Sequence, residues 1–444
     1  MMAMRNRGAY NPKTGYCVGD VVTFEGGAYR CVRPANGVSP NTNVRFEVWK
    51  RLNQDTEQAV LLIGDCSVDK LDVPKYGLPV LHLKGGASAM SKDNAVDLAY
   101  GYGERSGTAS VKWQGSSSLY FPKKNYTIEF DQAFEAKAGW GEHAKYCLKA
   151  NWVDASNIRN ILGAILWGKM VKLRTDITDP RKSMPNGGAI DGFPIWVTIN
   201  GESMGLYTMN IPKEPWLFGM TDAYPAAGFI CGEDYLCDKP AVGDGTDIKM
   251  EYAAGDKTVL LASFNNMISA LNSVQSAADL PALEAVLDVK SVIDYYAHCA
   301  FICNHDGIWK NYIMGTYDGV KWFISAYDMD ATFGTSADGT SYLWPNAYPT
   351  FDLGDSLNKL FIVAKTYYKE QIKETYQARR GWEFGEFDLY QAAYTLANQF
   401  PKALVMEDFR LWPERPSTNV NDVQAILDYA RIRGGSLDWT VQNM

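Results

Sequence analysis

The sequence predicts an α+β protein in which a β-rich region is followed by a mainly helical one. Apolar runs of strand length, some alternating with polar residues, dominate residues 58–132. Apolar residues recur at helical spacing from about residue 256 onward. Short β-prone runs separated by Gly-rich turns fill the first 50 residues. We therefore expect a small all-β module at 1–52, a β-rich region at 53–255 and a helical region at 256–444.

The composition excludes several classes of protein. Of the 444 residues, 46% are hydrophobic and 13% aromatic, enough for large packed cores. The formal net charge of -8 and the absence of a Lys/Arg-rich run argue against a nucleic-acid partner. No apolar run is long enough for a membrane span, and the start lacks the apolar core of a signal peptide, so we expect no membrane contact and no signal-peptide export. Eight cysteines without a paired CxxC pattern indicate mainly buried thiols.

The first 52 residues contain many aromatics for so small a unit. Two β-prone runs flank Glu-Gly-Gly at 25–27 and predict a hairpin. The rings of Tyr10, Tyr16, Tyr29 and Trp49 can form either a sugar-stacking face or the core of the module. The pattern Y-x-x-G-D-x-V-x-x-x-G-x-x-Y at 16–29, with a closing Trp, resembles the carbohydrate-binding modules of chitinases and phage tail proteins. That resemblance implies glycan binding through the four rings.

The β-rich region is expected to form an antiparallel sheet with one packed helix. Its strand-like runs are AVLLIGDC, LPVLHLKGG, TASVKWQGSSS and NYTIEFD. Helical spacing over 154–173 predicts a helix capped by Asp154 or Ser156. Two further strands flank Asn200-Gly201, a dipeptide that favours the positive φ angles of a tight hairpin turn.

Segment 304–334 of the helical region carries the candidate catalytic residues. A predicted helix ends at Asn304, Asp306 follows in a loop, and Asn311 leads into a strand. After a turn, a second strand ends at Asp328, with Asp330 two residues further on. This order resembles the catalytic segment of protein kinases, which implies an Asp that orients the hydroxyl nucleophile and an Asn and a later Asp that bind Mg²⁺.

The same segment has a purely structural interpretation. Asp306 can cap a turn, Asp318-Gly319 can close a hairpin, and DMDATFG at 328–334 can be a solvated loop.

Several stretches resemble the CotH family of spore-coat kinases. They are ASVKWQGSSSLYFPKKNYTIEF, YCLKANWVDASNIRNILG, FPIWVTINGESMGLYTMNIPKEP, NHDGIWKNYIM and WFISAYDMDATFG, in family order across about residues 58–440. The resemblance implies an atypical protein-kinase-like fold with a β-rich N-lobe and a helical C-lobe, and ATP with Mg²⁺ or Mn²⁺ as cofactors.

Carried over by position, the resemblance makes Asp306 the catalytic base and Asn311 and Asp328 metal ligands. Asp330 would be an additional acidic group or the principal ligand. The candidate ligands of the ATP phosphates are Lys123, Lys124, Lys149 and Arg159. The alternative for each lysine is a solvated strand residue, and for Arg159 a helix salt bridge.

Gln114-Gly115 departs from the Arg-Gly that the family often has before the two lysines. If that Arg helps to bind nucleotide, Gln would weaken ATP binding by removing a charge and its forked donors. The nearest substitute for a Gly-rich phosphate loop is GSSS at 115–118, which a plain turn explains equally well.

Two functions are therefore expected to compete. One is a kinase that phosphorylates protein hydroxyls, on its own chain or on a neighbouring coat or tail subunit. The other is a virion structural protein, such as a phage tail component, that keeps the fold as a scaffold and adheres to host-surface glycans. Both place the protein in a virion or on a spore or cell surface, where it could form a homo-oligomer. A glycoside hydrolase is less favoured, because Asp328 and Asp330 are too near in sequence to flank a glycosidic bond.

Overall fold

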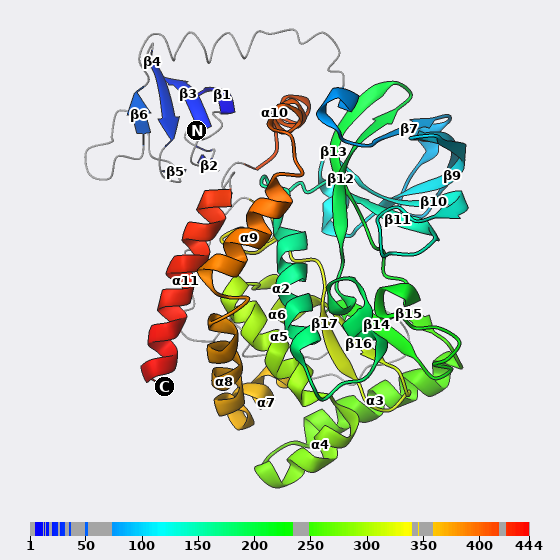
Figure 1. Cartoon of the computed structure of the whole chain (residues 1–444), viewed down its shortest axis with the longest axis vertical. Coiled ribbons are helices and arrows are strands. Elements are labelled where there is room, and N and C mark those ends of the chain that lie inside the picture. The colour runs from blue at the N-terminus through cyan, green and yellow to red at the C-terminus, as the bar shows by residue number, and fades with distance from the viewer. Residues whose placement is uncertain are drawn as a thin grey trace.

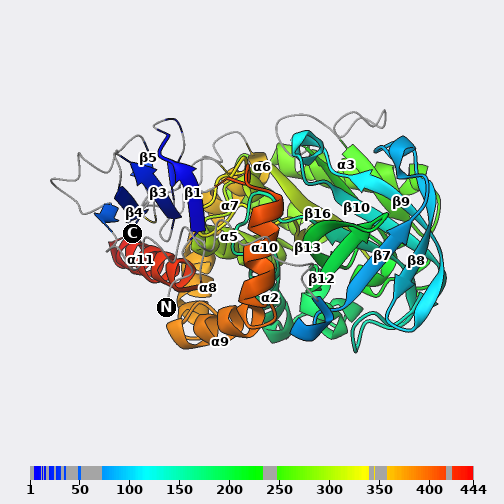
Figure 2. The same cartoon turned by 90° about the horizontal axis from the view of Figure 1, so that it is seen from above.

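The computed structural model confirms a mixed α+β protein (Figure 1). It describes residues 73–233, 248–339, 345, 358–416 and 423–443, and, before these, residues 5–11, 13, 15–16, 20–24, 27–31, 35–36 and 49–51. The predicted strand AVLLIGDC lies outside the described residues. Figure 2 shows barrel strands at one end of the molecule and the helices α8, α9 and α11 toward the other.

The N-terminal residues form a small sheet of order β1-β3-β4-β6. These strands are β1 (Arg5–Ala9), β3 (Asp20–Phe24), β4 (Gly27–Cys31) and β6 (Trp49–Arg51), and a separate pair joins β2 (Gly15–Tyr16) to β5 (Ala35–Asn36). The antiparallel pairing of β3 with β4 confirms the predicted hairpin.

Tyr16 lies in the core of this small sheet. Its side chain is buried together with Val22 and Cys31, while Tyr10 and Tyr29 are partly buried against them. The Tyr16 hydroxyl accepts a hydrogen bond from the backbone amide of Asn11. Of the two expectations for the rings, a role in the core therefore applies to Tyr16, whereas the side chain of Trp49 lies outside the described residues.

The β-rich region closes into a barrel. In spatial order its seven strands are β10 (Asn125–Phe134), β11 (His143–Lys149), β13 (Glu202–Asn210), β12 (Gly192–Ile199), β7 (Val80–Lys84), β8 (Val96–Tyr102) and β9 (Arg105–Gln114). The expected antiparallel sheet is wrong in one respect, because β7 pairs with β12 in parallel. This pairing leaves none of the seven strands with an open edge.

The local turn chemistry matches the expectation at the tip of β12 and β13. Asn200 and Gly201 have φ angles of 54° and 87°, the left-handed values that the hairpin turn requires. The two strands pair directly on either side of this turn.

Helix α2 (Arg159–Leu173) starts five residues after the predicted start at 154. The Asp154 carboxylate still accepts a hydrogen bond, at 2.8 Å, from the backbone amide of Arg159, so it acts on the helix start from a preceding turn. The helix is buried on nearly all sides and packs against α5 and α9.

A second sheet joins segments from both sides of residue 255. Its order is β15 (Ile248–Ala253), β14 (Gly228–Glu233), β16 (Lys310–Thr316) and β17 (Phe323–Ala326). The β16–β17 pairing confirms the hairpin predicted around Asp318-Gly319. Because β14 pairs with β16, the β-rich and helical regions share one sheet.

The remaining elements are mainly helical. The α-helices are α3 (Lys257–Ser273), α4 (Leu280–Val286), α5 (Val289–Ile302), α6 (Asp306–Trp309), α7 (Lys359–Tyr367), α8 (Lys369–Arg380), α9 (Glu386–Ala397), α10 (Lys402–Leu411) and α11 (Val423–Asn443). The 3₁₀ turns are η2 (Val73–Tyr76), η3 (Ala87–Ala89), η4 (Ser117–Tyr120), η5 (Pro180–Ser183), η6 (Pro185–Gly188), η7 (Pro215–Phe218) and η8 (Ala277–Asp279). Among the described residues, no helix combines the length and apolar character that a membrane span needs.

Candidate functional site

Asp306 opens the short helix α6 and does not lie in a loop as expected. The preceding helix α5 ends at Ile302, and Cys303 reverses the chain with a φ of 54°. Buried Asn304 then accepts a hydrogen bond, at 2.9 Å, from the backbone amide of Gly307. A Cβ at Gly307 would lie 2.3 Å from the Asn304 amide nitrogen, so a larger residue here would displace the Asn304 side chain from this turn.

Asn311 contacts Asp306 directly. Its side-chain amide nitrogen donates to the Asp306 carboxylate, and Lys310 Nζ lies 3.9 Å from the same carboxylate. Asn311 itself has a φ of 64°, a left-handed conformation that asparagine tolerates better than most residues. The structure thus brings the first Asp and the Asn of the predicted motif into contact.

Asp328 follows β17 and pairs with a lysine of the barrel. Lys149 Nζ, at the end of β11, lies 2.9 Å from Asp328 Oδ1. Asp328 has a φ of 53°, and such non-glycine outliers cluster at functional sites. The next residue is anchored to α2, because the backbone amide of Met329 donates to Asn160 Oδ1 at 2.9 Å.

The charges of Asp328 and Lys149 also affect the pKa of Asp330. Burial raises the pKa of its carboxyl to about 7, and the negative charge of Asp328 adds to this rise. Lys149 opposes the rise, whereas the charges of Asp154 and Asp306 contribute to it.

The carboxylates of Asp328 and Asp330 in turn affect the pKa of Lys149. Burial alone would lower its pKa, but the charges of Asp328 and then Asp330 raise the pKa above its usual range. Lys149 is therefore a cation at neutral pH, although only 12% of its side chain is exposed.

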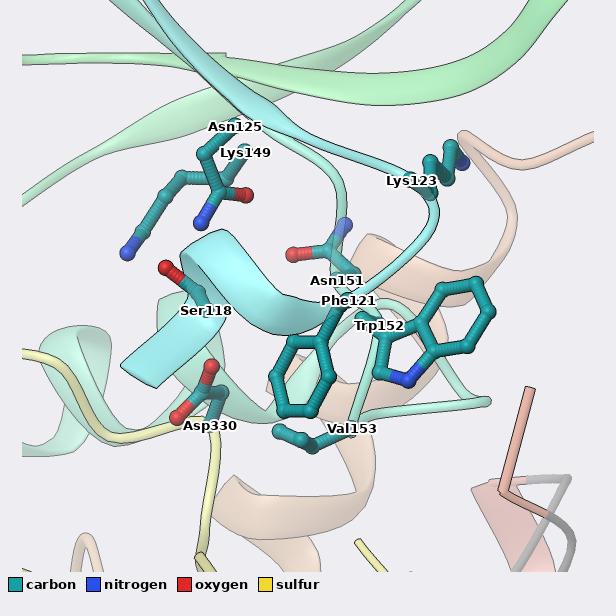
Figure 3. A pocket seen from close by; sticks show the side chains of 9 residues that line it. All are labelled: Ser118, Phe121, Lys123, Asn125, Lys149, Asn151, Trp152, Val153 and Asp330. Atoms are coloured by element: carbon teal, nitrogen blue, oxygen red, sulfur yellow. The ribbon is translucent and has the colours of Figure 1, made fainter. Parts of the chain in front are cut away.

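A small pocket adjoins these groups (Figure 3). Figure 3 shows Lys149 and Asn125 on one side of η4 and Asp330 on the other. Ser118 of η4 also lines the pocket, and the rings of Phe121 and Trp152 stack beside it with centroids 5.8 Å apart. The pocket thus combines an aromatic wall with a lysine, a carboxyl group and amide and hydroxyl groups.

Gly115 is required for the position of Ser118. Its φ is 125°, and a Cβ there would lie 1.9 Å from Ser118 Oγ. The preceding Gln114 donates to Cys147 Sγ at 3.2 Å, and its own side-chain oxygen is buried.

The other three cations chosen from the sequence bind groups of the protein itself. Lys123 Nζ is buried and donates to Asp408 Oδ1 of α10 at 2.7 Å. Lys124 Nζ donates to the backbone oxygens of Leu119 and Phe121. These bonds indicate structural roles, although Lys123 also borders the pocket.

Arg159 likewise holds the surrounding backbone together. Its guanidinium is fully buried, lies 2.6 Å from Asp154 Oδ1 and donates to the carbonyl oxygen of Thr332 at 2.8 Å. Arg159 therefore ties the start of α2 to the segment that follows Asp330.

Sequence reasoning missed one ion pair next to Asp328. Lys213 Nζ lies 2.5 Å from Glu251 Oε1 and 5.4 Å from the ring centroid of Tyr327. The only sequence signal was the position of Lys213 in the family-like stretch NIPKEP at 210–215, whereas Glu251 lay in no motif. The two residues are 38 positions apart in the sequence, so their contact depends on the tertiary fold and cannot be predicted from spacing.

The acidic residues do not form a dense metal cage. Within the described part of the chain, no three His, Cys, Asp or Glu side chains come together as a ligand set. Mg²⁺ uses few protein ligands and retains waters, so binding of this ion does not require a dense cage of protein side chains.

The fold and site define an α+β protein with a closed barrel and a mixed lysine–carboxylate site beside it. The family model described as CotH kinase protein matches residues 111–217 and 221–437, so the chain belongs to the CotH family. Comparison with curated proteins found no match.

Proposed function

We propose that the protein is an ATP-dependent kinase that transfers a phosphoryl group to protein hydroxyls, with the barrel as N-lobe and the helical region as C-lobe of a kinase-like fold. The observation that carries this proposal is the 2.9 Å pairing of Lys149 with Asp328, close to the partly buried Asp330 that lines the pocket. This pairing places a lysine of the barrel next to a carboxylate that follows the second sheet. Binding of a metal-bound phosphate requires both charges, since the carboxylate can hold the metal and the lysine can contact the phosphate. Membership of the CotH family supports the same function.

The donor atoms suit Mg²⁺ or Mn²⁺. Asp328 and Asp330 offer carboxylate oxygens, and Asn311 retains its side-chain oxygen because its nitrogen donates to Asp306. Hard oxygen donors of this kind favour both ions. When bound, the metal would offset negative charge on the phosphates.

Asp306 and its neighbours would orient and deprotonate the acceptor hydroxyl. Asn311 and Lys310 hold the Asp306 carboxylate in place, so that it can orient the hydroxyl and accept its proton. The new bond joins the hydroxyl oxygen to the γ-phosphorus, and the bond from that phosphorus to ADP breaks. Lys149 would stabilise phosphate charge from the barrel side.

Two Asp→Asn variants test this division of roles. Asn tolerates the left-handed backbone of Asp328, so Asp328→Asn removes the charge with little strain. We expect Asp328→Asn to lose metal-dependent binding of an ATP analogue, measured by calorimetry. Asp306→Asn should bind the analogue like the wild type but transfer labelled phosphate to protein about 100-fold more slowly or worse. Wild-type protein that binds no nucleotide at millimolar Mg²⁺ or Mn²⁺ would refute the proposal.

A scaffold function is the second candidate, and the engagement of Lys123, Lys124 and Arg159 with protein acceptors favours it. In this case the protein would be a structural or adhesive component of a phage tail, spore or cell surface, with neighbouring subunits, further copies of itself or a surface glycan as partners. Transfer of phosphate by the wild type, abolished in Asp306→Asn, would exclude a pure scaffold.

A further inference from the structure

The proposed nucleotide site has too few cations if only the residues chosen from the sequence are counted. A bound triphosphate carries several negative charges, which a metal ion offsets only in part. Lys123, Lys124 and Arg159 already bind Asp408, backbone oxygens and Asp154, respectively. Lys149 is the member of that set that faces the acidic pair.

The structure supplies another cation at the same place. Lys213 follows β13, and its Nζ lies over the ring of Tyr327, the residue directly before Asp328. The charge of Asp328 is among those that raise the pKa of Lys213, together with Cys231 and Glu251 and against the effect of burial. Lys213 thus lies against the ring of the residue that precedes Asp328, whereas Lys149 contacts Asp328 directly.

Glu251 holds this lysine in place. The Glu251 side chain is only 10% exposed and lies 2.5 Å from Lys213 Nζ and 3.0 Å from Lys249 Nζ. Two lysines and one glutamate give the cluster a net charge of +1. A lysine that is already ordered by a buried carboxylate loses less side-chain freedom when it binds an anion.

We propose that Lys213 binds the nucleotide phosphates together with Lys149, and that Glu251 is the positioning residue for Lys213. The inference rests on the proposed kinase function and adds to it a cation from the segment that links the barrel to the second sheet. The Lys213 side chain is 25% exposed and therefore not sealed in the protein interior, unlike that of Lys123, which has no exposed surface.

The test compares two ligands, a non-hydrolysable ATP analogue with Mg²⁺ and adenosine without phosphates. We expect Lys213→Met to weaken binding of the analogue about tenfold or more, the loss of one charge-assisted hydrogen bond, and to leave adenosine affinity unchanged. Lys213→Arg should restore most of the affinity, since it keeps the charge. Glu251→Gln should weaken binding of the analogue less than Lys213→Met does, since the lysine remains.

Lys169→Met is the matched control. Lys169 forms a half-exposed pair with Asp388 at 3.2 Å between α2 and α9, and its loss should change neither affinity. Equal affinity of wild type and Lys213→Met for the analogue would overturn the inference, as would a parallel loss of adenosine binding. Failure of the wild type to bind either ligand would instead refute the kinase proposal on which the inference rests.

Discussion

Asp408 of α10 allows a quantitative test of how the barrel is held to the helical region. Its carboxylate accepts hydrogen bonds from Lys123 Nζ at 2.7 Å, from the backbone amide of Leu206 at 2.9 Å and from Arg415 Nη1 at 2.7 Å. Each of the three charged side chains is at most 1% exposed. A Cβ at Gly205 would lie 2.1 Å from Asp408, so even the backbone of β13 is shaped around this carboxylate.

We expect Asp408→Asn to lower the free energy of unfolding by about 3–5 kcal/mol. The substitution keeps the shape but leaves two buried cations without their counter-charge, and removing one partner of a buried ion pair costs this much. Asp388→Asn is the control, because Asp388 pairs with Lys169 at 3.2 Å and both side chains are more than one third exposed. Exposed pairs contribute about 0–1 kcal/mol.

Urea unfolding followed by tryptophan fluorescence measures both variants. If Asp408→Asn lost no more stability than Asp388→Asn, the buried network would not hold the barrel and α10 together. A second measurement separates structure from ligand binding. Lys123→Met should also be destabilised, yet bind an ATP analogue like the wild type if its ammonium group serves Asp408 and not phosphate.

Two further predictions concern pH and the N-terminal module. Burial lowers the pKa of His298 to about 4, against 6.5 when unperturbed, so the unfolded state binds more protons below pH 6.5. Stability should therefore fall by up to about 3 kcal/mol between pH 6.5 and 4, and a His298→Gln variant with the same pH dependence as the wild type would contradict this. If the module binds glycans, Trp49→Ala should reduce retention on chitin or cell-wall glycan, whereas Tyr16→Ala should unfold the module, because Tyr16 is in its core. A wild-type module that is not retained would argue for a role in assembly instead.

Local features of the fold could be predicted from the sequence. The Asn200-Gly201 turn and the β16–β17 hairpin follow from residues that favour positive φ or close a tight turn. The start of α2 was predicted five residues early, because Asp154 is a capping residue by type but acts from a preceding turn. Signals of this kind depend only on neighbouring residues.

Features that depend on distant residues could not be predicted. The parallel pairing of β7 with β12 closes the barrel, yet nothing in the sequence of either strand indicates which strand it pairs with. Lys123 has the residue type and position of a phosphate ligand, but its counter-charge comes from Asp408, 285 residues away in the chain. Lys149 differs from Lys123 because its partner, although far away in the sequence, is Asp328, one of the acidic residues of the predicted site.

The separation of Lys123 and Asp408 in the sequence, 285 residues, also affects how the chain folds as it leaves the ribosome. Until α10 has been synthesised, Lys123 lacks the Asp408 carboxylate with which it forms a buried ion pair in the complete chain, so the barrel lacks the stabilising contribution of this contact. At about 5–20 residues per second, the 285 residues that separate the pair take roughly 15–60 s to synthesise. During that time the nascent barrel should remain incomplete and dependent on chaperones. Chains that stop before α10 should be degraded rather than accumulate as a free barrel.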